Sequence, residues 1–240
     1  MTFGSLFAGI GGMDLGLERA GMECRWQVEI DLYCQAVLRK HWPNVPKFGD
    51  IKTLTGAELE PVDLIAGGFP CQPVSHNGHQ RLTEDERWLW PEFARIVRVL
   101  RPGRVLLENV SNLFAAGMQL VASDLASMGY DAEWGCIPAS AVGAPQRRER
   151  AFIVAYSDRI GFKAGERVFA GLPQSGLDQE TWGNVSSRGA SGRVLPIPDP
   201  AVYGVADGFP SELDAIRAFG NAVVPQVAEF IGRRIMERAA

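Results

Sequence analysis

The chain has 240 residues, 46% of them hydrophobic and 22% charged, with four cysteines and a formal net charge of −4. These values suit one large globular domain, or one domain with a small appendage. The scattered cysteines form no CxxC pair, which argues against a disulfide framework or a zinc site, so no metal is expected. With no basic secretory start and no apolar run of membrane-spanning length, a cytoplasmic protein without a membrane partner is expected.

Short apolar runs alternate with helical patterns over residues 1–157. The runs predict strands at Ser5–Ala8, Arg25–Ile30, Asp63–Ala66, Arg104–Glu108, Tyr130–Ile137 and Ala151–Ala155. The helical patterns fall at Met13–Ala20, Leu32–His41, Leu89–Leu100 and Leu113–Met128. With a further strand ending before Asp50, the alternation predicts an α/β fold with a doubly wound, mostly parallel, seven-stranded sheet and helices on both faces.

In two of the predicted helices, the sequence indicates which side chains are buried and which are solvated. In Leu113–Met128, the residues Leu113, Leu120, Leu125 and Met128 suit a buried stripe. On the preceding helix, Arg95, Arg98 and Arg101 suit a solvated, salt-bridged face, which is the commoner fate of such a run.

The pattern changes after residue 157. Glycines recur from Asp158 to about Gly192 without a sustained period, which predicts a small irregular lobe or surface loops. Residues 193–240 then return to an ordered end, with a loop over Phe219–Pro225 and a terminal helix. We therefore expect three parts: residues 1–157, 158–192 and 193–240.

The first strand runs into Phe7-Ala-Gly9-Ile-Gly11-Gly12, directly before a helix. A glycine-rich turn at this place lets a ligand approach the backbone at a helix N-terminus, although a purely structural turn would also use glycine. The dinucleotide fingerprint GxGxxG fails, because Asp14 stands where its third glycine is needed.

Carboxylates follow the next two strands. Glu29 ends the second strand, where an acid can accept hydrogen bonds from both ribose hydroxyls of an adenosine cofactor. Asp50 follows Phe48-Gly49, where it could bind the adenine amino group. Either acid alone is more often a surface charge, but together with the glycine turn they describe an adenosine pocket.

A thiol and a carboxylate follow the two central strands. Cys71 comes after Pro70, beyond its apolar run, whereas a structural cysteine should lie within one. Glu108 follows the apolar run Val105–Leu107 on the neighbouring strand. A thiol and an acid on adjacent strand tips are a catalytic arrangement. Residues 146–150, Gln-Arg-Arg-Glu-Arg, supply cations near the start of the last strand.

In this order, the motifs resemble those of the cytosine-C5 DNA methyltransferase family, particularly its short bacterial and phage-borne members. They are the FxGxGG turn at 7–12, Glu29, Asp50, Pro-Cys-Gln at 70–72, Glu-Asn-Val at 108–110, Gln-Arg-Arg-Glu-Arg at 146–150 and Gly-Asn-Ala-Val at 220–223. The resemblance covers about residues 3–157 and 193–236. It implies the fold of S-adenosylmethionine-dependent methyltransferases and S-adenosyl-L-methionine as cofactor.

The resemblance also implies roles. The Cys71 thiolate adds to carbon 6 of a cytosine flipped out of double-stranded DNA, and carbon 5 then takes the methyl group. Glu108, held protonated near N3, stabilises the adduct, and Asn109 buttresses it. Arg148 contacts the base carbonyl or supports the carboxylate, and Arg150 lies in the same cluster. The implied catalytic set is Pro70, Cys71, Gln72, Glu108, Asn109, Arg148 and Arg150.

Two binding sets follow from the same resemblance. The implied cofactor-binding residues are Phe7, Gly9, Ile10, Gly11, Gly12, Glu29, Ile30, Asp50, Ile51, Gly68, Pro70, Leu89, Asn221 and Ala222. The implied DNA-binding residues are Ser75, Asn77, Arg81, Arg87, Arg148 and Arg188. The first four of these lie in Pro73–Arg87, which resembles the family's mobile loop.

Family members carry a much longer target-recognition insertion than residues 158–192. Base reading would then rest on a few loop side chains, namely Arg159, Lys163, Arg167, Trp182, Asn184 and Arg188. The resemblance implies a monomer that acts in a bacterial cell or phage-infected host, at the nucleoid and in the setting of restriction-modification.

Three alternatives stay open. A tRNA cytosine-C5 methyltransferase shares the chemistry, but its Cys-Phe-Thr triplet does not occur in this sequence. A nicotinamide dehydrogenase shares the sheet and the strand-two acid, but its fingerprint is broken at Asp14. A non-catalytic DNA-binding module would suit the small recognition region, but it would not need the intact cysteine, glutamate and arginines.

Overall fold

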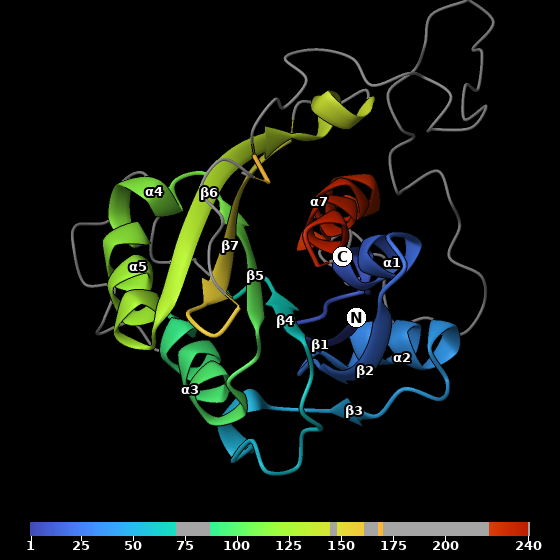
Figure 1. Ribbon diagram of the computed structural model, residues 1–240. Helices are drawn as coiled ribbons and strands as arrows, with labels where there is room; N and C mark the ends of the chain where they lie inside the picture. The colour runs from blue at the N-terminus through green and yellow to red at the C-terminus, as the bar shows by residue number, and fades with distance from the viewer. Residues whose placement is uncertain (71–86, 145–147, 161–167, 170–220, 240) are drawn as a thin grey trace, which may run out of the picture.

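The computed structural model describes residues 1–70, 87–144, 148–160, 168–169 and 221–239. They contain a seven-stranded sheet in the order β3-β2-β1-β4-β5-β7-β6 (Figure 1). The strands are β1 (Thr2–Leu6), β2 (Glu23–Val28), β3 (Lys47–Phe48), β4 (Leu64–Gly67), β5 (Arg104–Val110), β6 (Tyr130–Pro138) and β7 (Glu149–Ser157).

Parallel pairing dominates this sheet. β1 pairs in parallel with β2 and β4, β2 with β3, and β4 with β5, whereas β7 lies antiparallel between β5 and β6. The strand order reverses between β1 and β4, and ligands of open α/β sheets bind beyond the carboxyl ends of the strands at such a point. The predicted doubly wound, mostly parallel sheet is confirmed.

Helices cover both faces of the sheet (Figure 1). Right-handed crossovers place α1 (Gly12–Arg19) and α2 (Leu32–His41) on one face, where α7 (Pro225–Glu237) packs on α1. The other face carries α3 (Trp90–Leu100), α4 (Leu113–Ala116) and α5 (Met118–Ser127). Two 3₁₀ turns, η1 (Ile51–Thr53) and η4 (Ala139–Val142), complete the described elements. Among these helices, none is long and apolar enough to cross a membrane.

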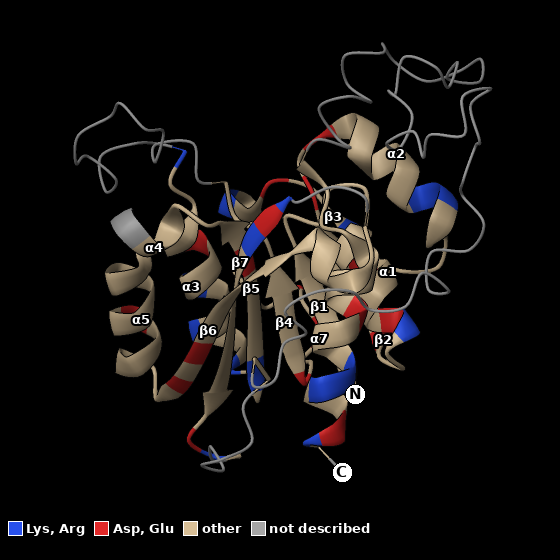
Figure 2. Ribbon diagram, turned by 90° about the horizontal axis from the view of Figure 1, so that it is seen from above, with Lys and Arg blue, Asp and Glu red and all other residues tan. Residues whose placement is uncertain are grey.

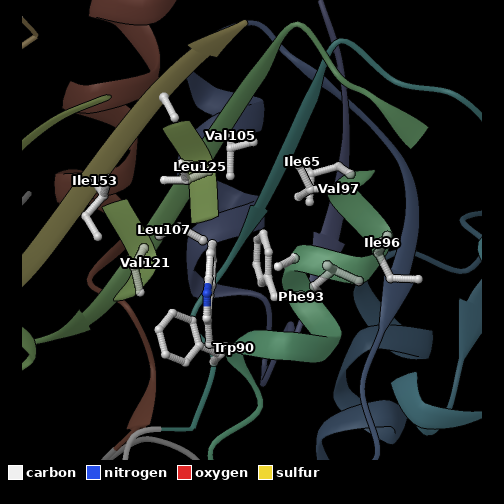
Figure 3. Close-up of a cluster of buried hydrophobic side chains, with 14 of the residues drawn as sticks. Ile65, Trp90, Phe93, Ile96, Val97, Val105, Leu107, Val121, Leu125 and Ile153 are labelled. Carbon is white, nitrogen blue, oxygen red and sulfur yellow. The ribbon is translucent and has the colours of Figure 1, made fainter. Parts of the chain in front are cut away.

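The larger core lies between the sheet and α3. Trp90 and Phe93 project from α3 toward Leu107 of β5 and Ile65 of β4, and all four side chains are buried (Figure 3). Burial of each large apolar side chain stabilises the fold by roughly 1.5–3 kcal/mol. The Trp90 Nε1 also donates to the Asp124 carboxylate at 2.7 Å, which joins α3 to α5. This core supports the strands whose tips carry the site.

The first strand begins three residues earlier than predicted and ends at Leu6. It stops there because Phe7 has a φ of 54°, in the left-handed region, which breaks the extended backbone. The predicted end at Ala8 was therefore wrong, and Phe7 and Ala8 belong to the turn. The second strand likewise ends at Val28, before Glu29.

The predicted helix Leu113–Met128 is two helices, α4 and α5, which meet at Gly117. A Cβ on Gly117 would lie 2.7 Å from the Trp88 ring, so the chain passes too close to that ring for any larger residue. The break changes the phase of the apolar stripe. Val121 is buried on α5, whereas Leu120 is 41% exposed, so the prediction that Leu120 is buried was wrong.

Arg95 is more than part of a solvated face. Its guanidinium pairs with Glu92 at 2.6 Å, as the charge pattern suggested. It also donates to the backbone carbonyls of Leu54 at 2.7 Å and Ile51 at 2.9 Å. These bonds tie α3 to η1, the turn that follows Asp50. A sequence pattern shows the i,i+3 partner but not carbonyls some 40 residues away.

Glycines allow α1 and α7 to approach closely. A Cβ on Gly16 would lie 2.3 Å from the Pro225 carbonyl oxygen and 2.5 Å from the Ala228 Cβ. A Cβ on Gly12 would lie 2.2 Å from the Val223 carbonyl oxygen. Distances this short exclude any side chain larger than hydrogen. The start of the chain and its last helix therefore form one packed unit.

The close contact between Gly16 and α7 predicts how a substitution at Gly16 changes the stability of the protein. In a solvated helix, glycine-to-alanine substitution stabilises by up to about 1 kcal/mol. We expect Gly16→Ala instead to destabilise by about 1–3 kcal/mol, because α7 must shift to admit the methyl group. Urea unfolding measures the difference. Gly103→Ala is the matched control, since its nearest contact would be an ordinary 3.6 Å. A more stable Gly16→Ala protein would contradict the packing of α7 on α1.

Candidate active site

A cavity of about 480 Å³ lies at the carboxyl ends of β1, β2, β4 and β5, and residues 221–223 close one wall. Its volume is in the range of small-molecule binding sites. Twelve predicted cofactor residues line it, namely Phe7, Gly9, Gly12, Glu29, Ile30, Asp50, Ile51, Gly68, Pro70, Leu89, Asn221 and Ala222. Of the predicted catalytic residues, Glu108, Asn109 and Arg150 share the same walls.

Two of the predicted cofactor-binding residues, Ile10 and Gly11, are not among the residues that line the described cavity. Ile10 packs against Tyr33 and Cys34, in a small apolar cluster on α2. Gly11 is the N-cap of α1 with a φ of 82°, and a Cβ there would lie 2.4 Å from the Trp42 ring. Both therefore shape the turn rather than the described cavity wall.

The cavity also contains residues that sequence reasoning missed. They include Ser5, Met13, Asp31, Cys34, Gly49, Phe69 and Val223. Asp31 had a readable signal, because an aspartate directly before a helix is a common N-cap. Its carboxylate accepts from the Cys34 backbone N–H at 3.0 Å. The others lie beside predicted residues, and only tertiary structure shows which of them reach the wall.

The glycine turn has an unusual backbone. Phe7 and Gly9 both have positive φ, 54° and 56°, and both line the cavity. A left-handed conformation strains a bulky residue such as phenylalanine, and strain of this kind gathers at functional sites. The Phe7 ring stacks on Phe93 of α3, with centroids 6.5 Å apart, which holds it in place.

Glu29 braces the turn. Its Oε2 accepts from the Gly9 backbone N–H at 2.7 Å and its Oε1 accepts from the Asp31 backbone N–H at 2.8 Å. Burial raises the pKa of this carboxyl, and the two backbone donors partly offset the rise. Gln35 donates to the Glu29 carbonyl at 2.6 Å. The acid is thus fixed at a strand tip, where a ribose-bearing ligand is recognised in related sheets.

Asp50 lies across the cavity from the glycine turn, at the end of β3. Its carboxylate caps η1 by accepting from the Lys52 backbone N–H at 2.9 Å. The same residue lines the cavity beside Gly49 and Ile51.

Glu108 is the buried acid of the site, with 7% of its surface exposed. Burial raises its pKa to about 7, although Arg150 and Arg148 lower it through their charges. The Arg150 Nε lies 3.1 Å from the Glu108 Oε1. The other oxygen occupies the place of a missing side chain, because a Cβ on Gly68 would be 2.6 Å from it. Near neutral pH this group can therefore hold or release a proton.

Asn109 ties the tips of β4 and β5 together. Its Nδ2 donates to the Phe69 carbonyl at 3.0 Å, and its Oδ1 accepts from the Val110 backbone N–H at 2.9 Å. Phe69 and Pro70 lead directly to Cys71, so Asn109 fixes the chain two residues before the cysteine. Cys71 and Gln72 themselves lie outside the described residues.

The arginines near β7 serve different partners. Arg150 pairs with Glu108, whereas Arg148 donates to the Ala222 carbonyl at 2.8 Å. Arg148 thus reaches the segment that closes the cavity wall. Basic and acidic residues alternate where β7 begins (Figure 2). The Glu108 charge nevertheless acts on Arg148, which places the acid within its electrostatic reach.

Most of the predicted DNA-contacting residues lie outside the part of the chain that the structure describes. Ser75, Asn77, Arg81 and Arg188 lie outside the described residues, as do Lys163, Arg167, Trp182 and Asn184 of the recognition region. Arg87 is described and exposed, directly before the buried Trp88, and Arg159 is exposed after β7.

The comparison with known proteins identifies the family. A family model for C-5 cytosine-specific DNA methylase matches residues 1–180, three quarters of the chain. The chain belongs to this family. The match includes every described strand of the sheet and the tips that carry Glu29 and Glu108.

Curated relatives of this DNA methylase family agree. The type II methyltransferase M.DsaV of Dactylococcopsis salina is 37% identical over 164 residues, 66% of this chain and 46% of its own length. M.HhaI of Haemophilus parahaemolyticus is 33% identical over 168 residues, 68% of this chain and 51% of its own length. The chain thus spans about half the length of the curated relatives it matches.

Solved structures share the fold of this family member. A DNA modification methyltransferase encoded within an E. coli prophage superposes with a TM-score of 0.61 at 27% identity, over 86% of this chain and 56% of its own. The Entamoeba histolytica methyltransferase EhMeth has a TM-score of 0.70 at 12% identity, over 100% and 99% of the two chains. The second likeness shows the fold alone.

The described cysteines and acids form no metal site. Cys24, Cys34 and Cys136 carry reduced thiols. Over the described part of the chain, no three side chains of histidine, cysteine, aspartate or glutamate gather as metal ligands would.

Proposed function

We propose that this chain is a DNA (cytosine-5-)-methyltransferase that uses S-adenosyl-L-methionine, with Cys71 as nucleophile. The observation that carries the proposal is the convergence of Glu108 and Pro70 on one cavity. A buried acid with a pKa near neutrality thus shares the cavity with Pro70, the residue directly before the proposed nucleophile. Nothing in a dinucleotide-binding enzyme requires that pairing.

The cavity suits the proposed cofactor. Its volume of about 480 Å³ is adequate for an adenosine-sized ligand. Glu29 would accept hydrogen bonds from the ribose hydroxyls, and Asp50 and Ile30 would flank the adenine. The glycine turn and residues 221–222 would hold the methionine end of the cofactor. When bound, S-adenosylmethionine supplies the electrophilic methyl group.

Cys71 and Glu108 would perform the chemistry on the base. The Cys71 thiolate forms a bond to carbon 6 of cytosine, and the electron pair displaced from the ring moves toward N3. Glu108 holds a proton at N3, so that the ring becomes a neutral enamine whose carbon 5 is nucleophilic. After carbon 5 has taken the methyl group, N3 returns its proton to Glu108. Loss of the carbon 5 proton to water then re-forms the ring double bond and expels the thiolate.

The arginines and Asn109 would position these groups. Arg150 lies against Glu108 and would keep the carboxyl aimed at the base, while Arg148 links the same region to Ala222. Asn109 would hold the Phe69–Pro70 segment against β5, since it already donates to the Phe69 carbonyl. Pro70 would stiffen the approach to Cys71, and Gln72 would complete the loop.

The substrate would be double-stranded DNA with its target cytosine flipped out, because a stacked base cannot reach a cavity of this kind. Residues 1–157 and 193–240 would form the catalytic unit and residues 158–192 a reduced recognition region. Ser75, Asn77, Arg81, Arg87, Arg148 and Arg188 would contact the DNA. The curated relatives are named as type II methyltransferases. We accordingly place the chain in restriction-modification, as a monomer in the bacterial cytoplasm.

Bisulfite sequencing of plasmid DNA from cells that express the chain tests the proposal. We expect protected cytosines within one short sequence context. Parallel labelling of DNA and of transfer RNA with radioactive S-adenosylmethionine separates the two substrates, and labelling of tRNA alone would overturn the DNA assignment. Trapping on 5-fluorocytosine DNA should give a covalent adduct that resists denaturation. Its absence would favour a non-catalytic DNA-binding protein.

A further inference from the structure

A second buried acid lies behind the cofactor cavity and has no part in the proposed chemistry. Asp14, the third residue of α1, is completely buried. Its Oδ2 accepts from the Ser5 hydroxyl at 3.0 Å. Its Oδ1 accepts from the Gln27 amide at 2.9 Å and from the Cys24 thiol at 3.8 Å. All three side-chain partners are neutral donors.

Asp14 is one side chain away from the cavity. Its partner Ser5 and the two residues before it, Gly12 and Met13, all line the wall. The carboxylate therefore lies directly behind the glycine turn. In the proposed function, this is the part of the cavity that receives the methionine end of the cofactor, together with Asn221 and Ala222.

The pKa of Asp14 and its three donors favour the ionised carboxylate at pH 7.5. Burial raises the pKa of its carboxyl to about 6, and the bonds from Gln27 and Ser5 limit the rise. At pH 7.5 most molecules therefore carry the charge. An ionised carboxylate that is buried without a paired cation is costly, and proteins retain few of them.

The surroundings do not neutralise that charge. Across the described residues, no basic side chain forms an ion pair with Asp14. Glu18, one turn later on α1, adds a further negative charge. Lys47 of β3 acts on Asp14 only at a distance, because its ammonium donates to the carbonyls of Trp42 and Val45. Cys24 is a neutral thiol, since burial holds its pKa far above the ordinary range.

We propose that Asp14 determines specificity within the cavity, by favouring the positively charged sulfonium of the methyl donor over the neutral thioether of the product. The proposal rests on the proposed function. Donor and product, S-adenosylhomocysteine, differ by one methyl group and one positive charge. A buried anion behind the wall attracts the charged form, and poor solvent screening preserves the attraction. The same residue would therefore assist product release.

The acids that line the cavity are less suited to this role. Asp31 is only partly buried and caps α2 by accepting from the Cys34 backbone N–H. Glu29 and Asp50 lie at the tips of the second and third strands, where they would contact the ribose and adenine shared by both ligands. Glu108 is paired with Arg150, so its charge is largely compensated. Asp14 differs from these acids because it is fully buried and, within the described parts of the chain, forms no ion pair.

Calorimetric titration of the full chain with each ligand tests the proposal. We define the selectivity ratio as the Kd of S-adenosylhomocysteine divided by the Kd of S-adenosylmethionine. Asp14→Asn should lower this ratio by about three- to tenfold at pH 7.5, mainly by weakening S-adenosylmethionine binding. The substitution keeps the shape of the side chain and its acceptor for Gln27. Glu18→Gln, which removes a charge from the same helix, should leave the ratio unchanged.

The pH dependence gives a second measurement, whose main part is made on a protein with Asp14 intact. Protonation of Asp14 removes its charge, so the selectivity ratio should fall as pH drops from 7.5 to 5.5. Glu108 also titrates in this range, so the measurement is made in a Glu108→Gln protein. The double variant Glu108→Gln, Asp14→Asn should show a nearly flat ratio.

The outcomes separate the two proposals. An unchanged ratio in Asp14→Asn, or a flat pH profile in Glu108→Gln, overturns the role of Asp14 and leaves the proposed function intact. An equal loss of affinity for both ligands also overturns it, because that pattern reports a merely structural role. If the unsubstituted chain binds neither ligand, the proposed function fails and this inference fails with it.

Discussion

Replacement of Cys71 by alanine is expected to reduce methyl transfer to DNA by on the order of 10⁴-fold or more. Carbon 5 of cytosine is a poor nucleophile until a thiolate has added to carbon 6, and alanine offers no group that can add. Tritium transfer from labelled S-adenosylmethionine to DNA measures the loss. The covalent adduct with 5-fluorocytosine DNA should vanish together with the activity.

A second cysteine variant controls for the loss of a thiol. Cys136 is a partly exposed thiol on β6, where it pairs with Ala151 of β7 and is not among the residues that line the described cavity. Cys136→Ser should retain activity within a fewfold of the unsubstituted chain. Methylation by Cys71→Ala at a rate within tenfold of the parent would rule out covalent catalysis through this residue.

Glu108→Gln is expected to lower kcat by about 10²- to 10⁴-fold, with little change in the Kd of the cofactor. The glutamine keeps the size of the side chain but cannot deliver a proton to N3. Single-turnover methylation with saturating DNA measures the chemical step. Arg150→Met should give a smaller loss in the same assay, because it removes a partner of the acid rather than the acid itself.

The pKa of Glu108 also predicts the direction in which the methylation rate changes with pH. The pKa of Glu108 is raised to about 7, so the protonated fraction falls as pH rises through neutrality. The single-turnover rate of the unsubstituted chain should decrease as pH rises above about 7. The rate of Glu108→Gln should not show this decrease. An identical decrease in the variant would assign it to another group.

The same shift predicts that the variant folds. A carboxyl whose pKa is higher in the folded state contributes stability at acidic pH, and that contribution is lost as pH rises from 4.5 to about 7. At pH 8 the buried charge therefore opposes folding. Glu108→Gln should melt at a temperature equal to or above that of the unsubstituted chain. A large fall in Tm would mean that the activity loss reflects unfolding.

Much of the fold could be predicted because local signals agreed with tertiary structure. The predicted helix Leu32–His41 agrees with the structure at both ends, and the structure shows Asp31 capping its start. By contrast, β3 has only two residues and shows no periodic pattern of its own. Its place had to be inferred from Asp50.

The errors have tertiary causes. A left-handed Phe7 shortened the first strand, and a close approach to Trp88 divided a predicted helix at Gly117. Neither event leaves a mark in hydrophobic periodicity.

The candidate site was predictable where function requires residues at strand tips. Glu29 and Glu108 follow apolar runs, so topology brings them to one edge of the sheet, and Asp50 was expected at the end of a third strand. Asn221 and Ala222 came only from the family resemblance, because nothing local places them beside the glycine turn. Asp14 was recognised only as an obstacle to a dinucleotide fingerprint. Its contacts with Ser5 and Gln27 join three elements and cannot be read from spacing.

The packing of α7 on α1 determines when the protein becomes competent during its synthesis. β1 and α1 are synthesised about 200 residues before α7, but Met13 and Leu17 belong to the apolar cluster that includes Val227, Ala228 and Ile231. Until residues 221–237 emerge from the ribosome, α1 lacks these contacts and the cavity lacks a wall. While the intervening residues are made, a nascent chain would therefore present an incomplete binding site and an exposed apolar helix face to chaperones.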